Sequence, residues 1–207
     1  AQGLQSFDAD GFTVGNDGAW NQSSENYVAW NWKANSIPTI NTDGTNIDSV
    51  VSVNAAAGFS IVQFTTPSTF SGSNTVGHGL GTTPDMIIVK ATSTIEDWYV
   101  YHSATGLNQA MRLNSTIAAG SATYLFGTVN STVFNPNYTS TSPITNIAYC
   151  FTSIAGFSKM ASYSGTGSSN PITGLGFSPN WVMIKSSTSA ENWAIFDTSR
   201  GSKVLYA

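Results

Sequence analysis

Charge is scarce in this sequence. Only 9% of its 207 residues are charged, and seven Lys and Arg stand against eleven Asp and Glu, for a net charge of −4. No basic run is present that could neutralise a phosphate backbone, so we expect no nucleic-acid partner. No stretch approaches the roughly eighteen consecutive apolar residues of a membrane span, and no signal-peptide pattern is present. We therefore expect neither a membrane span nor a targeting segment.

Cysteine and histidine are also nearly missing. The single Cys150 lies in an apolar run and cannot form an intrachain disulfide, so we expect a small buried hydrophobe rather than a reactive thiol. The two histidines, His78 and His102, have no zinc-ligand spacing and no second sulfur or histidine nearby in sequence. We expect structural or turn roles for both, no bound metal and no cofactor.

The acidic residues show no catalytic arrangement. They are scattered, whereas glycoside hydrolysis needs two carboxyl groups held in one cleft. Asp8–Gly11 resembles the start of a calcium loop, but no acidic closing ligand follows it. Gly77–Gly81 opens no helix and is therefore not a nucleotide loop. We expect no catalytic residues and no enzyme activity; a depolymerase-type enzyme is a minor alternative that paired acids in a deep cleft would support.

Hydrophobic and hydroxyl residues dominate instead. The hydrophobic fraction of 41% is enough for a core, and Ser and Thr fill about a quarter of the positions. Short segments rich in β-branched and aromatic residues, bounded by Gly, Pro, Asn and Ser, predict strands. In the middle of the chain these are Phe59–Thr65, Thr75–Gly79, Asp85–Ala91, Asp97–His102, Ala110–Asn114, Thr132–Asn135 and Asn146–Ser153. The pattern predicts an all-β antiparallel sandwich, of jelly-roll or immunoglobulin-like type.

An internal repeat organises the chain. Three blocks recur in the same order: Ala57–Ser60 as Ala155–Ser158, Gly79–Lys90 as Gly174–Lys185 without a gap, and Glu96–Tyr101 as Glu191–Phe196. Ordered self-similarity of this kind is the signature of tandem structural repeats. We therefore expect tandem β-sandwich repeats of roughly a hundred residues each.

The start of the chain resembles the back half of such a repeat. Gly11–Val14 is similar to Thr132–Phe134, and Tyr27–Trp32 is similar to Asn146–Phe151. The predicted organisation is a back half over residues 1–34, a connector over 35–56, a complete β-sandwich repeat over 57–154 and the front half of a further repeat over 155–207. On this interpretation the chain is a window onto a longer array.

Recurring aromatic residues are expected in the core. Trp98 and Trp193 occupy equivalent positions, as do Tyr101 and Phe196, and aromatics repeated in register usually pack between strands. The first repeat segment holds three further tryptophans, Trp20, Trp30 and Trp32, of which the last two share one face of a predicted strand. These three are the candidate glycan-stacking residues, if they are exposed.

Several blocks carry a resemblance to a known repeat. They are Phe12–Gly15, Tyr27–Lys33, Ala57–Val62, Val76–Leu80, Met86–Lys90, Trp98–Ser103, Ile147–Phe151 and Gly156–Lys159. Together they resemble an uncharacterised tandem repeat of tail-fibre or virion appendage proteins of marine tailed bacteriophages, including cyanophages and pelagiphages. The resemblance brings no established site residues.

The resemblance implies a role class. We expect a virion structural protein, located on the virion or outside the cell, that spaces or displays host-contacting parts. Its partners would be further copies of itself, a trimer by analogy with fibres, and other virion proteins. The alternative is a β-sandwich module that binds a host cell-surface glycan in host attachment, since exposed aromatics on such folds commonly bind sugars.

Overall fold

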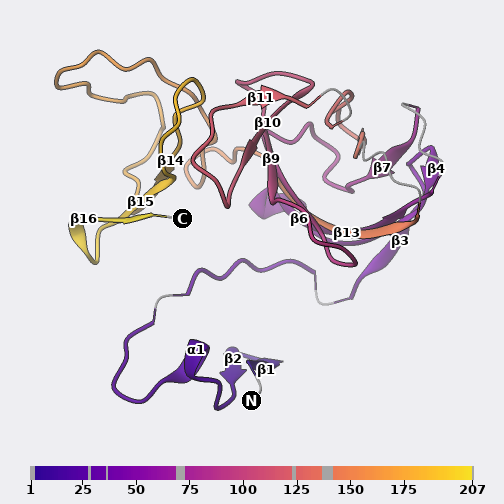
Figure 1. Ribbon diagram of the computed structural model, residues 1–207, viewed down its shortest axis with the longest axis horizontal. Helices are drawn as coiled ribbons and strands as arrows, with labels where there is room; N and C mark the ends of the chain where they lie inside the picture. The colour runs from indigo at the N-terminus through magenta and orange to yellow at the C-terminus, as the bar shows by residue number, and fades with distance from the viewer. Residues whose placement is uncertain are drawn as a thin grey trace. The chain divides into compact units, whose positions relative to one another are not determined.

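The protein is almost entirely β in a computed structural model (Figure 1) that describes residues 3–27, 29–35, 37–68, 73–122, 125–136 and 142–206. It divides into an N-terminal unit, Ala1–Trp32, and a main unit, Lys33–Ala207. The main unit contains residues 57–154, the predicted complete repeat, and residues 155–207, the predicted front half of a further repeat (the C-terminal repeat segment). Each unit is described by itself.

The N-terminal unit is a small hairpin followed by one helical turn. Strands β1 (Leu4–Asp8) and β2 (Gly11–Val14) pair antiparallel, and α1 (Gly18–Asn21) follows them. The Asp17 side chain caps α1 by accepting a hydrogen bond from the amide of Ala19 at 3.0 Å. No strand is present over residues 29–32, so the strand predicted there is wrong.

An eight-stranded sheet forms the larger layer of the main unit. Its order is β11-β10-β9-β8-β13-β6-β5-β3, and every pair in it is antiparallel. The strands are β3 (Thr39–Asn41), β5 (Ser49–Asn54), β6 (Phe59–Thr66), β8 (Met86–Ala91), β9 (Tyr99–His102), β10 (Gln109–Arg112), β11 (Gly120–Ser121) and β13 (Ile144–Phe151). Strand β13 comes last in the repeat and lies between β6 and β8, so it joins the two halves of the sheet.

A three-stranded sheet covers one face of the larger one. It contains β4 (Asn46–Ile47), β7 (Thr75–Gly77) and β12 (Val133–Phe134), in the order β12-β7-β4. Buried side chains of both sheets form the core cluster, with Val76 and Phe134 from the small sheet meeting Phe64 and Ile87 from the large one. Phe64 and Phe134 make an edge-on aromatic contact with ring centroids 5.8 Å apart. The predicted all-β sandwich is confirmed.

All seven strands predicted for residues 57–154 are present as β6 to β10, β12 and β13. Their alternation explains their placement: β13 buries every second residue, and Ala148 and Cys150 on its core face are fully buried. The segment 35–56, interpreted from sequence as a connector, contributes the three strands β3, β4 and β5. Strand β5 pairs with β6 along its whole length, which extends the sheet of the complete repeat.

The C-terminal repeat segment forms its own three-stranded antiparallel sheet. Its strands are β14 (Trp181–Ile184), β15 (Ala194–Asp197) and β16 (Gly201–Tyr206). Trp181 opposes Asp197 as Met86 opposes His102 in the complete repeat, and the remaining pairs of β14 and β15 follow the pairs of β8 and β9 in step. The sequence repeat is therefore also a repeat of strand register.

The counterpart of β6 does not form a strand. Ala155–Ser158 matches Ala57–Ser60 in sequence, yet residues 159–163 have no strand assignment and Phe157 is 63% exposed, against 4% for its counterpart Phe59. Strand β6 pairs with β5 and β13. Within the described residues 155–206 neither of these neighbours has a counterpart.

Candidate functional site at the junction between repeats

The complete repeat and the C-terminal segment meet across an apolar junction. The outer face of β8, β9 and β10, opposite the sandwich core, carries Met86, Ile88, Val100 and Met111. Trp193, which precedes β15, packs into this face with only 3% of its surface exposed. Met183 of β14 adds to the same cluster. Figure 1 shows β14–β16, in yellow, beside β9 and β10.

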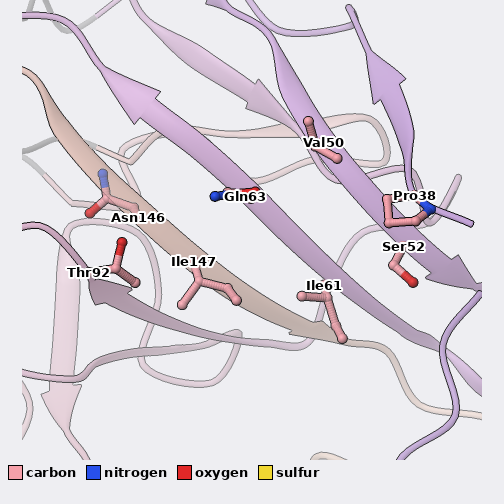
Figure 2. Close-up of a pocket in the computed structure, with 8 residues that line it drawn as sticks. All are labelled: Pro38, Val50, Ser52, Ile61, Gln63, Thr92, Asn146 and Ile147. Carbon is pink, nitrogen blue, oxygen red and sulfur yellow. The ribbon is translucent and has the colours of Figure 1, made fainter. Parts of the chain in front are cut away.

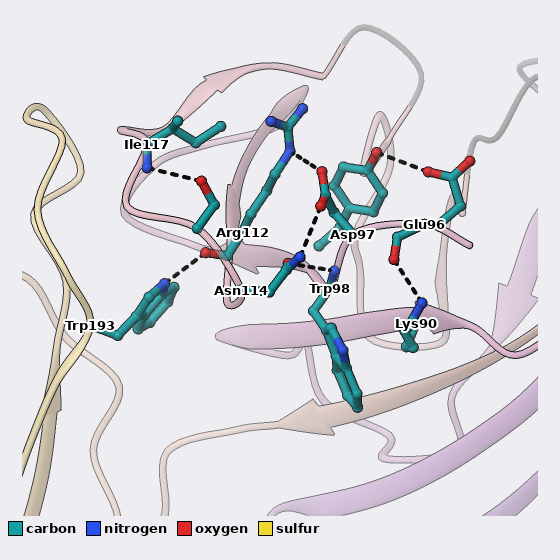
Figure 3. Close-up of polar contacts among 10 residues, drawn as sticks. Lys90, Glu96, Asp97, Trp98, Arg112, Asn114, Ile117 and Trp193 are labelled. Atoms are coloured by element: carbon teal, nitrogen blue, oxygen red, sulfur yellow. Dashed lines mark hydrogen bonds and ion pairs between the residues drawn. The ribbon is translucent and has the colours of Figure 1, made fainter. Parts of the chain in front are cut away.

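Two hydrogen bonds fix the junction. The indole Nε1 of Trp193 donates to the backbone carbonyl of Arg112 at 2.7 Å, as Figure 3 shows, and the amide of Ala119 donates to the carbonyl of Ser187 at 3.0 Å. A buried indole nitrogen needs such a partner, because an unpaired polar group away from water costs free energy. The hydrogen bond therefore fixes where the ring sits as well as how deeply it is buried.

The two repeats use equivalent surfaces for this contact. Ile195 and Met183 of the C-terminal segment correspond to Val100 and Ile88 of the complete repeat. Trp193 therefore projects from the face of its own hairpin that is equivalent to the face of the complete repeat into which it packs. The prediction that recurring aromatics lie in a core is confirmed for Trp193 and for Tyr101, which packs against Phe126 with ring centroids 5.3 Å apart. Trp98 and Phe196 are only half-buried, so for these two residues burial in a core is not reached.

A polar cluster borders the junction (Figure 3). Arg112 Nε lies 2.8 Å from a carboxylate oxygen of Asp97, and Asn114 Nδ2 donates to the other oxygen at 2.9 Å. The Arg112 guanidinium also lies 5.7 Å from the centroid of the Tyr99 ring. Burial, and then the charge of Glu96, raise the pKa of the Tyr99 hydroxyl. The hydrogen bonds and the ion pair of this cluster hold the side chains of Arg112, Asp97 and Asn114 in place beside the junction.

His78 has a structural role, as predicted. It is fully buried, its Nδ1 accepts a hydrogen bond from the amide of Leu80 at 3.2 Å, and its Nε2 lies 3.0 Å from the carbonyl of Asn130. These partners require the neutral ring with the proton on Nε2. Burial lowers the pKa of His78, which keeps the ring in that form.

His102 likewise closes a turn. Its Nδ1 accepts a hydrogen bond from the amide of Ala104 at 3.1 Å, and its carbonyl accepts one from the hydroxyl of Thr105 at 2.8 Å. Burial lowers the pKa of His102, and the charge of Asp85 partly opposes that shift. Both histidines therefore form hydrogen bonds with backbone groups.

Cys150 is buried, as predicted, and burial raises the pKa of its thiol to about 12. A thiol with that pKa is not a nucleophile at neutral pH, because the thiolate is the reactive form. Across the part of the chain that the structure describes, no group of three or more His, Cys, Asp or Glu side chains could hold a metal ion. Among the same residues no helix is long and apolar enough to cross a membrane.

Several acidic residues accept hydrogen bonds from their neighbours. Asp8 receives the hydroxyls of Thr13 at 2.7 Å and Ser6 at 2.8 Å, and these two bonds lower the pKa of its carboxyl group. Asp85 accepts the amide of Ser153 at 2.7 Å and so ties the start of β8 to the end of β13. Such carboxylates stabilise turns and strand ends.

The candidate glycan-stacking residues Trp20, Trp30 and Trp32 all lie in the N-terminal unit and are exposed by 59%, 43% and 50%. The Trp20 ring lies over Gly3, where an added Cβ would come within 3.1 Å of its indole nitrogen. Trp30 and Trp32 are outside any strand, so the shared strand face predicted for them is not formed. The structure thus shows three exposed rings without a common strand to align them.

A shallow hollow of about 260 Å³ lies on the large sheet (Figure 2). Its lining is neutral throughout: Pro38, Val50, Ser52, Ile61, Gln63, Thr92, Asn146 and Ile147. It contains neither an aromatic ring for stacking on a sugar nor an ionisable group for acid–base chemistry. Sequence analysis did not predict this hollow, because β5, which lines it beside β6, comes from a segment interpreted as a connector.

The fold and the junction define an all-β protein built from structural repeats that pack through a tryptophan-centred face. The chain belongs to the family described as a domain of unknown function (DUF7483), whose model matches residues 1–206. No curated protein and no solved structure shows significant similarity to it.

Proposed function

We propose that this chain is a structural segment of a phage virion appendage, such as a tail fibre, located on the virion and outside the cell. It spaces or displays the parts that contact the host. The observation that carries the proposal is the junction in which Trp193 joins two copies of one β-repeat through equivalent faces. The sequence resemblance to phage appendage repeats supports the same role.

The junction suits a mechanical task. A buried indole held by a hydrogen bond to Arg112 resists both sliding and rotation, because either movement would expose apolar surface and leave the indole nitrogen unpaired. A low content of charged residues leaves the outer surface to hydroxyl and amide groups. A stack of such repeats would hold a fixed spacing without a ligand or cofactor.

Imaging of intact particles tests the proposal. Antibodies raised against the 207-residue chain, detected by immunogold electron microscopy on virions that encode it, should label an appendage at a defined distance from the capsid. Pre-absorption of the antibodies with the chain is the control and should remove the label. Label that is absent from particles but present in the soluble lysate would contradict a virion role.

The assembly state gives a second test. Fibre proteins are commonly oligomeric, and we propose that this chain associates with copies of itself, as a trimer by analogy with fibres. Analytical ultracentrifugation over a wide concentration range should give a mass above that of one chain. A compact monomer at every concentration would contradict this part of the proposal.

Glycan binding is the second candidate function, and the exposure of Trp20, Trp30 and Trp32 favours it. A glycan array with host surface polysaccharides should show binding that is lost when each of the three is changed to Ala. Tyr163→Ala, at an equally exposed aromatic of the main unit, should leave binding unchanged. No binding to any polysaccharide of a susceptible host would remove this candidate.

A further inference from the structure

The outer face of the large sheet continues past the junction. Strand pairing places six neighbouring side chains in one row across β5, β6, β13, β8, β9 and β10: Ser52, Ile61, Tyr149, Ile88, Val100 and Met111. Val100 and Met111, at one end of the row, are buried in the cluster around Trp193. The row therefore runs without a break from the junction onto β13, β6 and β5.

The part of this outer face on β3, β5, β6 and β13 is neutral and mostly apolar. A second row of directly paired residues crosses these four strands: Ile40, Val50, Gln63 and Ile147. Ile40 is 74% exposed and Val50 is 41% exposed. These four residues, together with Ser52, Ile61 and Tyr149 of the first row, are called the hollow face, because the hollow of Figure 2 lies among them.

The charge nearest in register to the hollow face is turned to a loop. Lys90 pairs with Ile147 across β8 and β13, and its ammonium group donates to the backbone carbonyl of Glu96 at 2.7 Å (Figure 3). A neutral face can meet a copy of itself without like-charge repulsion and without burying an unpaired charge. The composition of the hollow face therefore suits contact with a like surface.

The junction already shows outer faces of two copies of the repeat in contact. Ile88 of the complete repeat and its counterpart Met183 of the C-terminal segment both belong to the cluster around Trp193. The outer face of one copy thus packs against the equivalent face of the other. The hollow face is the continuation of that same surface on the complete repeat.

We propose that the hollow face is an interface at which two copies of this chain pack face to face. A second copy is the partner that fits, because the hollow face is continuous with a contact between two copies of the repeat and carries no charge. Such an isologous contact places residues near its two-fold axis opposite the same residues of the partner. The proposal goes beyond the proposed function, because this two-fold contact is distinct from the three-fold one expected by analogy with fibres.

The size of the hollow face sets the strength of the contact. Four strands about 4.8 Å apart, each contributing about five residues of about 3.3 Å, give roughly 300 Å² of sheet. A standard interface buries about 800 Å² on each partner, so we expect weak association of single chains, measurable up to about 1 mM. In an array several repeats pair at once, and multivalency raises the overall affinity.

A charge swap at Gln63 tests the contact. Gln63 lies between Val50 and Ile147 and is exposed, so a charged residue there leaves the core of each molecule intact. Gln63→Lys and Gln63→Glu should each associate at least about tenfold more weakly than the wild type, because like charges then face each other. An equal mixture of the two variants should recover the wild-type association, as measured by sedimentation equilibrium of the full chain.

Ser169→Lys and Ser169→Glu are the matched controls, on an exposed serine of the C-terminal repeat segment. They make the same changes in net charge as the Gln63 variants, and both should associate as the wild type does. Circular dichroism of every variant checks that the fold is retained.

Crosslinking gives a readout that keeps the face neutral. Packed sheets lie about 10 Å apart, which is too far for a disulfide and within reach of a short bismaleimide. Gln63→Cys should therefore form a crosslinked dimer, and Ser169→Cys should remain a monomer. The native Cys150 is buried, and burial raises the pKa of its thiol to about 12, so it does not react.

Three results would overturn the proposal. The first is a wild-type chain that stays monomeric up to about 1 mM. The second is wild-type association of both Gln63 variants, which would place any self-association on another surface. The third is weak association of both variants that mixing does not restore, which would show that a different surface or partner covers the hollow face. Labelling of virions by antibodies is independent of all three, so the virion role is tested separately.

Discussion

The hairpin β8–β9 of the complete repeat and the hairpin β14–β15 of the C-terminal segment have matching sequences and the same strand register, but their environments differ. Ile87, Val89 and Tyr101 are buried on the core face of the first hairpin, whereas Val182, Ile184 and Phe196 are half-buried on the second. Among the residues that the structure describes, the first hairpin has β13 beside it and a small sheet above it, and the second has no counterpart of either. The comparison shows that the repeat sequence is sufficient for a hairpin and its register, while burial depends on strands that come from elsewhere.

The largest expected effect comes from removing an aromatic side chain in the two environments. Tyr101→Ala should lower the free energy of unfolding by about 3–5 kcal/mol, since it empties a core position next to Phe126. Phe196→Ala, at the equivalent half-buried position, should cost less than half as much. Urea denaturation followed by circular dichroism measures both variants. Equal losses would show that the C-terminal hairpin has a completed core in solution.

The junction tryptophan should have the next largest effect. Trp193→Ala removes the buried ring between the repeats, with a local loss of about 3–5 kcal/mol. We expect faster hydrogen exchange in β14–β16 and little change in β6 and β13. Trp193→Phe keeps an aromatic ring but loses the hydrogen bond to Arg112, and should cost about 1 kcal/mol for that bond. Trp98→Ala is the counterpart control, and an equal effect on β14–β16 would contradict a special role for Trp193.

The free energy of unfolding should depend on pH through His78 in the complete repeat. The C-terminal segment has Thr173 at the equivalent position, so this dependence should be absent there. Burial lowers the pKa of His78 below the ordinary value of 6.5, so the unfolded chain takes up a proton before the folded one does. Stability is therefore independent of this group above that value and decreases as the pH falls below it.

The variant His78→Thr should flatten the decrease in unfolding free energy between about pH 6.5 and pH 5, a window above the range in which ordinary carboxyl groups titrate. Its absolute stability will be lower at every pH, because a buried ring and two hydrogen bonds are lost. The measured quantity is the slope of unfolding free energy against pH. An unchanged slope would assign the acid sensitivity to another group, with His102 the next to test.

The smallest effect is expected for the ion pair beside the junction. Asp97 corresponds to Asn192 in the C-terminal segment, so Asp97→Asn makes the two copies alike at this position. The side chains of Arg112 and Asp97 are 38% and 36% exposed, and pairs with such exposure contribute about 0.2–1 kcal/mol. Urea denaturation in low and high salt should show a loss within this range that shrinks as salt is added. A loss of several kcal/mol would show that the pair is buried in an assembly.

Much of the fold could be predicted from the sequence. The seven strands of residues 57–154 were identified because β-branched and aromatic residues cluster between turn residues. The structural roles of His78 and His102 were predicted from the lack of a zinc-ligand spacing, and the burial of Cys150 was predicted from the apolar run in which it lies. The strands of the segment 35–56 were missed, although Ser49–Asn54 is rich in valine and could have been recognised as a strand.

The junction could not be predicted from the repeat. Trp98 and Trp193 are equivalent in sequence, yet only Trp193 is buried, because burial depends on the face of the neighbouring repeat. The strand predicted over Tyr27–Trp32 also shows that local sequence does not decide whether neighbouring strands are present. Its pattern matches β13, but β13 is held by two neighbours, and residues 29–32 form no strand.

The sequence by itself determined which segments can be strands and the order of the repeat blocks. These properties depend on side-chain type and alternation over a few residues, which are local. The tertiary structure decided which of those segments pair, which equivalent aromatic is buried and where two repeats meet. Pairing and burial require partners far away in the chain, such as β13 between β6 and β8, so two copies of one sequence pattern have different surroundings.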